Sequence, residues 1–293
     1  MTNDNQPILV FGATGRQGGS VVNALLKRWR VRAFVRNAAN PASAALREAR
    51  VDVFSGSLDD RKAISAAMKN AYGVFIVLPG NLSAEDEVQY ATEIANIATD
   101  NGVAHLVYSS GASVGETLTG VARFDSKPRI EAYIRNLPVV STIVRPMIFM
   151  DMLVRPGSGL DKGQLVSLMV PDKPMQLTAV EDIGKYVAAI FSHRRRFAGQ
   201  TLKIASDTVT GVELAATLSE VAGRPITYAR VADHVLEQNA DLRQMAASLE
   251  NGPLSEHADL AFLRQINPEI LSFRAWLEGS GRKALEEALS PSP

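Results

Sequence analysis

Apolar and polar positions follow two alternating rhythms along the first 145 residues. Short runs of β-branched, aromatic and other apolar residues predict six strands, at 8–12, 31–35, 51–55, 73–78, 104–109 and 139–145. Between these runs, apolar residues recur at helical spacing and predict helices at 17–29, 41–49, 60–69, 84–101 and 123–136. Strands that are apolar at almost every position are typical of sheets covered by helices on both faces. Because crossovers between parallel strands are right-handed, this order predicts a doubly wound α/β sheet, which binds ligands outside the carboxyl ends of its strands.

The pattern changes after Pro146. An irregular stretch rich in proline and glycine extends to about residue 174, and loops of this length commonly line a functional site. It is followed by a predicted helix at 180–191, a strand at 202–205, and a mostly helical remainder from 212 with one short strand at 226–231. We therefore expect a binding domain over 1–150, with a possible return strand near 201–206, and a smaller, mainly helical lobe for substrate or partner over 151–293.

The composition narrows the class of protein. A chain of 293 residues with 46% hydrophobic and 21% charged side chains is typical of a compact globular protein of about two domains. Its 31 basic and 31 acidic side chains cancel, so the charge gives no case for direct nucleic-acid binding or a membrane anchor. The sequence contains no cysteine, which excludes thiol chemistry, and any redox role must use a cofactor.

The sequence also bears on metal binding, on location and on a short basic run. The four histidines are too far apart for a ligand pair on one helix, and no carboxylate cluster has the spacing of a metal loop, so we expect no metal site. The first seven residues lack the basic region of a signal peptide, and no run of 18 apolar residues follows, which makes the cytoplasm the expected location. The basic run at 193–196 is interpreted as a solvated surface at a helix end.

A glycine-rich turn follows the first predicted strand and opens the first predicted helix. Glycine in such a turn permits a tight bend and close approach to a pyrophosphate, and the helix start offers free N–H groups and a positive dipole end to the anion. The turn predicts a Rossmann-type dinucleotide site; a strand-to-helix turn without a ligand is the alternative. The residues of this candidate site are Gly12, Thr14, Gly15, Arg16, Gln17 and Gly18.

Arg36 ends the second strand, at the place where an acidic residue would read the ribose of NAD. An arginine there can instead pair with the 2′-phosphate of NADP through its bidentate fork, and Arg16 can reach the same phosphate or the diphosphate. The sequence therefore predicts NADP(H) as cofactor. The alternative for both arginines is an ordinary solvated charge.

Two further strand ends face the expected cofactor. Leu78 and Pro79 lie at the end of the fourth strand, and Ser109 and Ser110 lie at the end of the fifth. Small side chains and adjacent glycines at such ends let a ring lie close to the backbone. Ordinary loop sequence explains them almost as well.

Several motifs follow one another along the chain. They are the glycine turn, the strand end at 35–37, Phe124-Asp125-Ser126-Lys127 with Ile130, Glu131 and Tyr133, then Val144-Arg145-Pro146, and Val180-Glu181-Asp182-Ile183-Gly184. Taken in order, these motifs resemble the NmrA-like family and within it the NADPH-sensor branch of the atypical short-chain dehydrogenases. The resemblance extends from residue 8 to about 277. It implies that Lys127 contacts the nicotinamide ribose and that the segment after Pro146 passes near the nicotinamide.

The sequence departs from ordinary short-chain dehydrogenases at the proton donor. Those enzymes use a Tyr-x-x-x-Lys pair, in which the ammonium lowers the pKa of the phenol. Here Arg123 stands four positions before Lys127, and none of the six tyrosines has a lysine four residues later. A second departure is Ser57, where relatives often carry an acid, and this puts the adenine contact in doubt.

Two functions remain open. The first is an NADPH-dependent reductase of a small apolar or aromatic acceptor, such as a quinone or enone, with Lys127 or water as proton source; it does not need the tyrosine if the acceptor requires little acid assistance. The second is a redox sensor that acts through a regulatory protein partner without turnover, as some NmrA-like proteins do. We favour the reductase, which needs an apolar pocket beside the nicotinamide.

Overall fold

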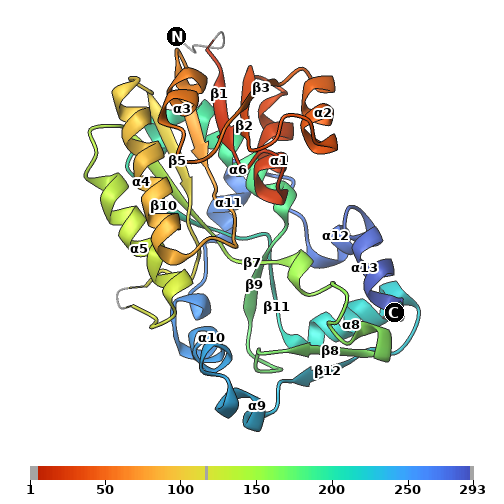
Figure 1. The fold of residues 1–293 in the computed structure, drawn as a ribbon. Helices are drawn as coiled ribbons and strands as arrows, with labels where there is room; N and C mark the ends of the chain where they lie inside the picture. Colours follow the sequence, from red (N-terminus) through yellow and green to blue (C-terminus); the bar gives the residue numbers. More distant parts are fainter. Residues whose placement is uncertain (1–5, 116–117, 291–293) are drawn as a thin grey trace. The chain divides into compact units, whose positions relative to one another are not determined.

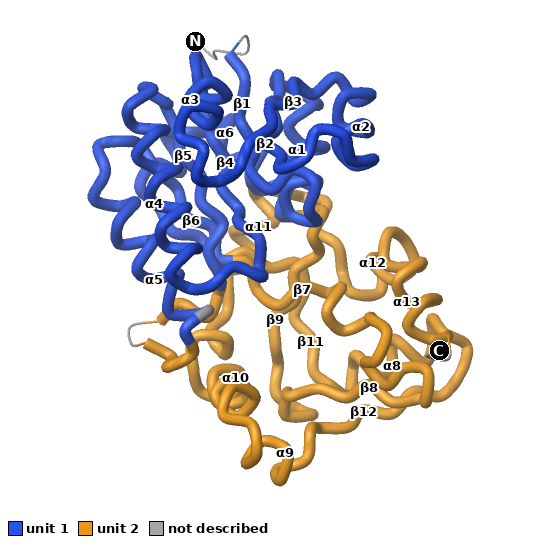
Figure 2. The backbone as a smooth tube through the Cα atoms, in the orientation of Figure 1, with its two compact units in different colours: residues 1–111, 122–145, 183–202 blue, residues 112–121, 146–182, 203–293 orange. Residues whose placement is uncertain are grey.

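The computed structural model describes residues 6–115 and 118–290, apart from the side chain of Arg123. The first five residues of the polar N-terminal segment and the Arg123 side chain, on both of which the sequence analysis drew, lie outside the described residues. The chain forms two compact units, shown in different colours in Figure 2. Unit 1 comprises the described residues of 1–111, 122–145 and 183–202, and unit 2 comprises those of 112–121, 146–182 and 203–293.

Unit 1 is built around a seven-stranded sheet in the order β10-β6-β5-β4-β1-β2-β3 (Figure 1). Its strands are β1 (Ile8–Phe11), β2 (Val31–Val35), β3 (Asp52–Ser55), β4 (Gly73–Ile76), β5 (His105–Ser109), β6 (Ser141–Pro146) and β10 (Thr201–Ile204). β1 pairs in parallel with both β2 and β4, so the strand order reverses at β1. A doubly wound sheet binds its ligand at such a reversal.

Helices cover both faces of this sheet. They are α1 (Arg16–Leu25), α2 (Pro41–Glu48), α3 (Arg61–Met68), α4 (Ala84–Asp100), α5 (Ala122–Arg135), α6 (Val180–Ser192) and α7 (Arg194–Phe197). Ile64 of α3, Ile94 of α4 and Ile130 of α5 belong to one buried apolar cluster with strand residues. α6 packs against the sheet through Phe191, whose ring lies 5.4 Å from that of His105. The predicted doubly wound sheet is therefore confirmed.

The predicted strands of the first 145 residues all form, with ends within two residues of the expected positions. The possible return strand near 201–206 is β10, which lies beside β6. The main difference in the helices is α1, which ends at Leu25 rather than near Trp29. Trp29 is buried beyond the helix end, where its ring stacks 5.0 Å from that of Tyr72.

Unit 2 contains short strands and has more helical residues than strand residues. A three-stranded sheet has the order β11 (Asp207–Val209), β9 (Met175–Thr178), β7 (Ile148–Phe149), and β8 (Gln164–Ser167) pairs in parallel with β12 (Thr227–Arg230). The helices are α8 (Gly211–Ala222), α9 (Asp233–Gln238), α10 (Ala240–Asn251), α11 (Leu260–Ile266), α12 (Phe273–Glu278) and α13 (Arg282–Leu289). The sequence pattern did not predict β7 and β8, which lie in the stretch expected to be irregular, or β9 and β11.

The buried carboxylate of Asp182 organises part of unit 2. It accepts hydrogen bonds from Ser206 Oγ at 2.7 Å, Asn267 Nδ2 at 2.8 Å and the backbone N–H of Leu271 at 3.0 Å. These contacts join the start of α6 to segments 24, 85 and 89 residues further along the chain. Asp182 is therefore a structural residue of this unit.

The two units are not the consecutive segments 1–150 and 151–293 that the sequence analysis expected. Segment 183–202, most of which is α6 and α7, packs into unit 1, whereas 112–121 packs into unit 2. Within the described residues, the structure has no helix whose length and apolar character would let it cross a membrane.

Candidate functional site

The turn between β1 and α1 requires glycine at two places. Gly12 adopts φ +69°, and a Cβ atom there would lie 2.7 Å from the backbone oxygen of Val77. A Cβ on Gly18 would lie 2.1 Å from the oxygen of Gly12, because the first turn of α1 packs directly on the end of β1. Both glycines are thus explained by the packing of the turn.

Gly15 differs from these two glycines. It is exposed, its φ of −93° suits any residue, and its Cβ would have one neighbour within 4 Å, the Gly12 oxygen at 3.2 Å. The turn is closed by a 2.8 Å hydrogen bond from the N–H of Gly15 to that same oxygen. A side chain at Gly15 would need only a small adjustment of the turn, so the space outside Gly15 is open to a ligand.

The start of α1 is left without a side-chain cap. Gly15 supplies no capping hydrogen bond, and no acidic residue lies in the first turn. By contrast, α2, α3 and α4 are capped by the preceding residues Asn40, Asp60 and Ser83, each of which accepts a hydrogen bond from a backbone N–H three residues later. The uncapped positive end of α1 suits an anion.

Arg36 follows the last residue of β2 and is exposed. Within the described residues it makes no hydrogen bond or ion pair. The loop directly after it is held in place, because Asn37 Oδ1 accepts from the N–H of Ala39 at 2.8 Å and Ser43 Oγ donates to the backbone oxygen of Asn37 at 2.7 Å. Arg16 is also exposed, at the first position of α1. These two guanidinium groups fit the predicted role of binding phosphate.

The strand ends predicted to face the cofactor lie at the carboxyl edge of the same sheet. Leu78 and Pro79 are half-buried after β4. Ser109, at the end of β5, is buried and donates to Gln17 Oε1 of α1 at 2.8 Å, so the structure brings two predicted site residues together. Thr14 is exposed in the glycine turn, and Ser57 is exposed after β3. Pro146 is the last residue of β6 and belongs to unit 2.

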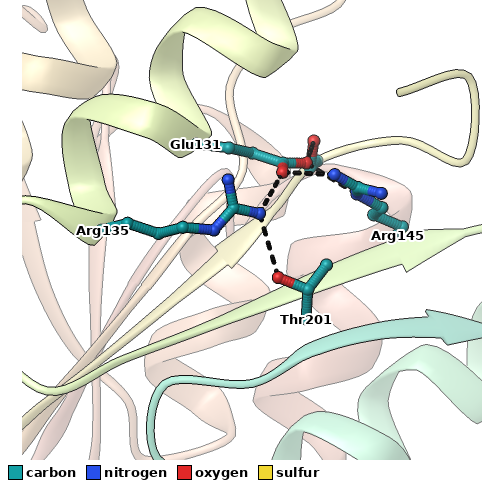
Figure 3. Close-up of polar contacts among 5 residues, drawn as sticks. Glu131, Arg135, Arg145 and Thr201 are labelled. Atoms are coloured by element: carbon teal, nitrogen blue, oxygen red, sulfur yellow. Dashed lines mark hydrogen bonds and ion pairs between the residues drawn. The ribbon is translucent and has the colours of Figure 1, made fainter. Parts of the chain in front are cut away.

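Ser110 leads into a buried network centred on Glu131 of α5. Ser110 Oγ donates to Glu131 Oε1 at 2.6 Å, and Arg145 on β6 binds both carboxylate oxygens, through Nε at 2.9 Å and Nη2 at 2.6 Å. Arg135 Nη2 donates to Glu131 Oε2 at 2.6 Å and to Thr201 Oγ1 at 3.0 Å (Figure 3). The network ties α5 to the carboxyl ends of β5 and β6.

These hydrogen-bond donors stabilise the ionised form of Glu131. Burial by itself raises the pKa of this carboxyl group, but the hydrogen bonds from Arg145, Ser110 and Arg135, together with the positive charge of Arg145, lower the pKa below its ordinary value. Glu131 is therefore ionised at neutral pH.

Lys127 on α5 does not stand alone at the site. Its ammonium donates to Glu87 Oε1 of α4, and the neighbouring Ser126 Oγ donates to Glu87 Oε2 at 2.6 Å. Sequence reasoning missed Glu87. The signal was present, however, because Glu87 occupies the apolar stripe of α4 together with Ala91, Ile94 and the other buried residues of that helix.

The phenol of Tyr108 on β5 does not replace the missing tyrosine. It is 1% exposed, and its hydroxyl has no hydrogen-bond partner within the described residues. Burial first, and then the negative charges of Glu87 and Glu131, raise the pKa of Tyr108 well above its ordinary value. A phenol buried in this way neither reaches a substrate nor ionises at neutral pH.

The residues present fit a nicotinamide dinucleotide phosphate. Open space outside Gly15, an uncapped helix start and an exposed arginine after β2 offer room and positive charge for the phosphates. The fold and this turn define an α/β protein of the Rossmann type.

Comparison with known proteins identifies the family. The sequence model of the NmrA-like family matches residues 4–257, and the chain belongs to this family. The chain is 29% identical over 252 residues to the NmrA-like family domain-containing oxidoreductase hkm9 of Aspergillus hancockii, covering 75% of this chain and 74% of that protein. The predicted family resemblance is confirmed.

Two solved structures share the fold. NmrA, a negative transcriptional regulator solved in complex with NADP, superposes with a TM-score of 0.77 at 20% identity and covers 96% of this chain and 97% of that one. The triphenylmethane reductase of Citrobacter sp., complexed with NADP(H), superposes with a TM-score of 0.79 at 19% identity and covers 97% of this chain and 100% of the other. The predicted cofactor agrees with the dinucleotides of both proteins.

Proposed function

We propose that this chain is an NADPH-dependent reductase of a small apolar or aromatic acceptor of the quinone or enone type. The observation that carries the proposal is the glycine turn, where Gly15 leaves open space at the uncapped start of α1 while Arg36 is exposed and has no partner among the described residues. Together, these features could bind a diphosphate and a 2′-phosphate at one edge of the sheet. The oxidoreductase and reductase names of relatives support the class of activity.

Each predicted site residue has a proposed role. Gly12, Thr14, Gly15, Gln17 and Gly18 form the turn that holds the diphosphate, and Arg16 and Arg36 bind the 2′-phosphate. Leu78, Pro79, Ser109, Ser110 and Pro146 border the nicotinamide half, and Lys127 binds its ribose. When bound, the cofactor supplies a hydride from C4 of the nicotinamide.

The protein contributes a proton donor that is weaker than the usual phenol. An ammonium group has three N–H donors, and Lys127 gives one of them to Glu87. The other two are available for a ribose hydroxyl and for the acceptor or a water molecule beside it. A quinone or enone needs less acid assistance than an aldehyde, which favours the first two as acceptors.

The alternative is an NADP(H) redox sensor that acts through a protein partner. The absence of a Tyr-x-x-x-Lys pair favours it, as does the likeness in fold to NmrA, a negative transcriptional regulator. The cytoplasmic location stays a prediction for either function.

NADPH oxidation by the pure protein across a panel of quinones, enones and aldehydes tests the proposal. We expect acceptor-dependent oxidation with quinones or enones that clearly exceeds the rate of a Gly15→Val control, and slower reaction with aldehydes. A wild-type rate equal to the control for every acceptor at saturating NADPH would refute the reductase and leave the sensor. Failure of NADPH to bind at all would refute both.

A further inference from the structure

One carboxylate holds two consecutive residues of α5. Glu87 on α4 is 7% exposed, and its two oxygens accept from Ser126 Oγ and from the ammonium of Lys127. The side chain of Lys127 is itself only 21% exposed. The charged end of the lysine is therefore held by a buried partner on α4.

We propose that Glu87 is a positioning residue for Lys127, which it holds ready for the nicotinamide ribose. The inference rests on the proposed function, in which Lys127 contacts that ribose. Glu87 touches neither cofactor nor substrate in this role and acts through Lys127 alone. It fixes the position of the ammonium in the free protein, so that its other two N–H donors are already in place when the cofactor arrives.

A contribution to stability is a poor explanation for this arrangement. An ion pair buried at a position of the apolar stripe gains little net stability, because both charges lose water. The pair does remove the rotational freedom of a long side chain. If that freedom is already lost in the free protein, cofactor binding does not have to remove it, and affinity rises accordingly.

Glu87→Gln is an informative change because Glu87 accepts hydrogen bonds from two donors. A glutamine has one amide oxygen, so it can accept from Ser126 or from Lys127, while its NH₂ group then faces the other donor. The ion pair is lost and Lys127 regains its freedom. We expect NADPH to bind about threefold to tenfold more weakly, the range for one freed side chain at a binding site.

A fragment of the cofactor separates this role from a general disturbance of the site. Adenosine 2′,5′-bisphosphate carries the adenosine and 2′-phosphate without the nicotinamide ribose. In calorimetric titrations of the full chain, Glu87→Gln should bind NADPH more weakly than the wild type does. Its affinity for the fragment should equal that of the wild type. Glu85→Gln is the matched control, since Glu85 is an exposed acid in the same turn of α4, and it should leave both affinities unchanged.

A double-mutant cycle tests whether Glu87 acts through the lysine. In a Lys127→Met background, Glu87→Gln should weaken NADPH binding no further. If Glu87→Gln fails to fold, Glu87→Asp replaces it; this shorter carboxylate cannot reach both donors, and it should weaken NADPH binding with the fragment again unaffected.

Three results would overturn the inference while leaving the proposed function intact. They are unchanged or tighter NADPH binding by Glu87→Gln, an equal loss for NADPH and the fragment, and an undiminished loss in the Lys127→Met background. Tighter binding would mean that the negative charge of Glu87 repels the cofactor. Absence of NADPH binding by the wild type would instead overturn the proposed function and this inference together.

Discussion

Replacing Glu131 with glutamine should destabilise the protein by much more than a typical surface change. The carboxylate is fully buried and accepts hydrogen bonds from Ser110, Arg135 and Arg145, and the side chain of Arg145 is itself 17% exposed. Glutamine keeps the size of the side chain but removes the negative charge that faces the guanidinium of Arg145. Removing one partner of a buried pair costs about 3–5 kcal/mol.

The lower end of that range applies here. Glutamine still accepts one hydrogen bond, and the side chain of Arg135 is 43% exposed, so its charge is screened by solvent. We therefore expect a loss of about 3 kcal/mol in the free energy of unfolding at neutral pH. For a protein of this size, such a loss lowers Tm by about 6–12 °C.

The loss should depend on pH in a defined direction. The folded-state pKa of Glu131 is lowered below its ordinary value, so its ionised form contributes stability that is complete above the unfolded-state pKa of about 4.3. This contribution disappears as the pH falls through the folded-state pKa. The difference in stability between wild type and Glu131→Gln should therefore be full at neutral pH and should shrink in acid below the unfolded value.

Urea unfolding of both proteins at neutral and acid pH measures this difference. Glu286→Gln is the control, because its partner Arg282 lies 3.0 Å away in an ion pair whose side chains are 58% and 61% exposed; its loss should stay below about 1 kcal/mol. A loss for Glu131→Gln as small as that of the control would refute the reasoning. A larger loss that did not change with pH would show that packing, rather than charge, makes Glu131 important.

Three further predictions concern the proposed cofactor site. Arg36→Ala should reduce the preference for NADPH over NADH by roughly tenfold, the value of one charge-assisted contact, in titrations with both cofactors; an unchanged preference would remove Arg36 from the site. Gly15→Val should fold, because its backbone angles are ordinary, yet fail to bind NADPH; retained binding would contradict the diphosphate assignment. Lys127→Met should lower turnover by well over the tenfold expected from one lost ribose hydrogen bond, whereas a smaller loss of kcat would limit Lys127 to binding.

The sequence by itself determined the alternating strands and helices of the first 146 residues and the place of the proposed binding edge. Strands such as Ile8–Phe11 and Gly73–Ile76 are buried throughout, and the helices between them carry apolar stripes, so local periodicity is enough to locate both. The glycine turn and Arg36 follow strand ends, and parallel strands bring their carboxyl ends to one edge of the sheet. Those positions therefore followed from the order of elements alone.

Tertiary structure decided the short strands of unit 2 and the pairing of distant side chains, which local sequence patterns do not contain. Strands β7 and β11 have only two and three residues, and β8 and β9 contain polar residues in place of the continuous apolar runs of β1 and β4. All four pair with segments far along the chain. The same holds for Glu87 and Lys127, which are 40 residues apart and meet only because α4 packs beside α5. An acidic residue on an apolar stripe signals a buried charge, but its partner depends on distances that packing alone sets.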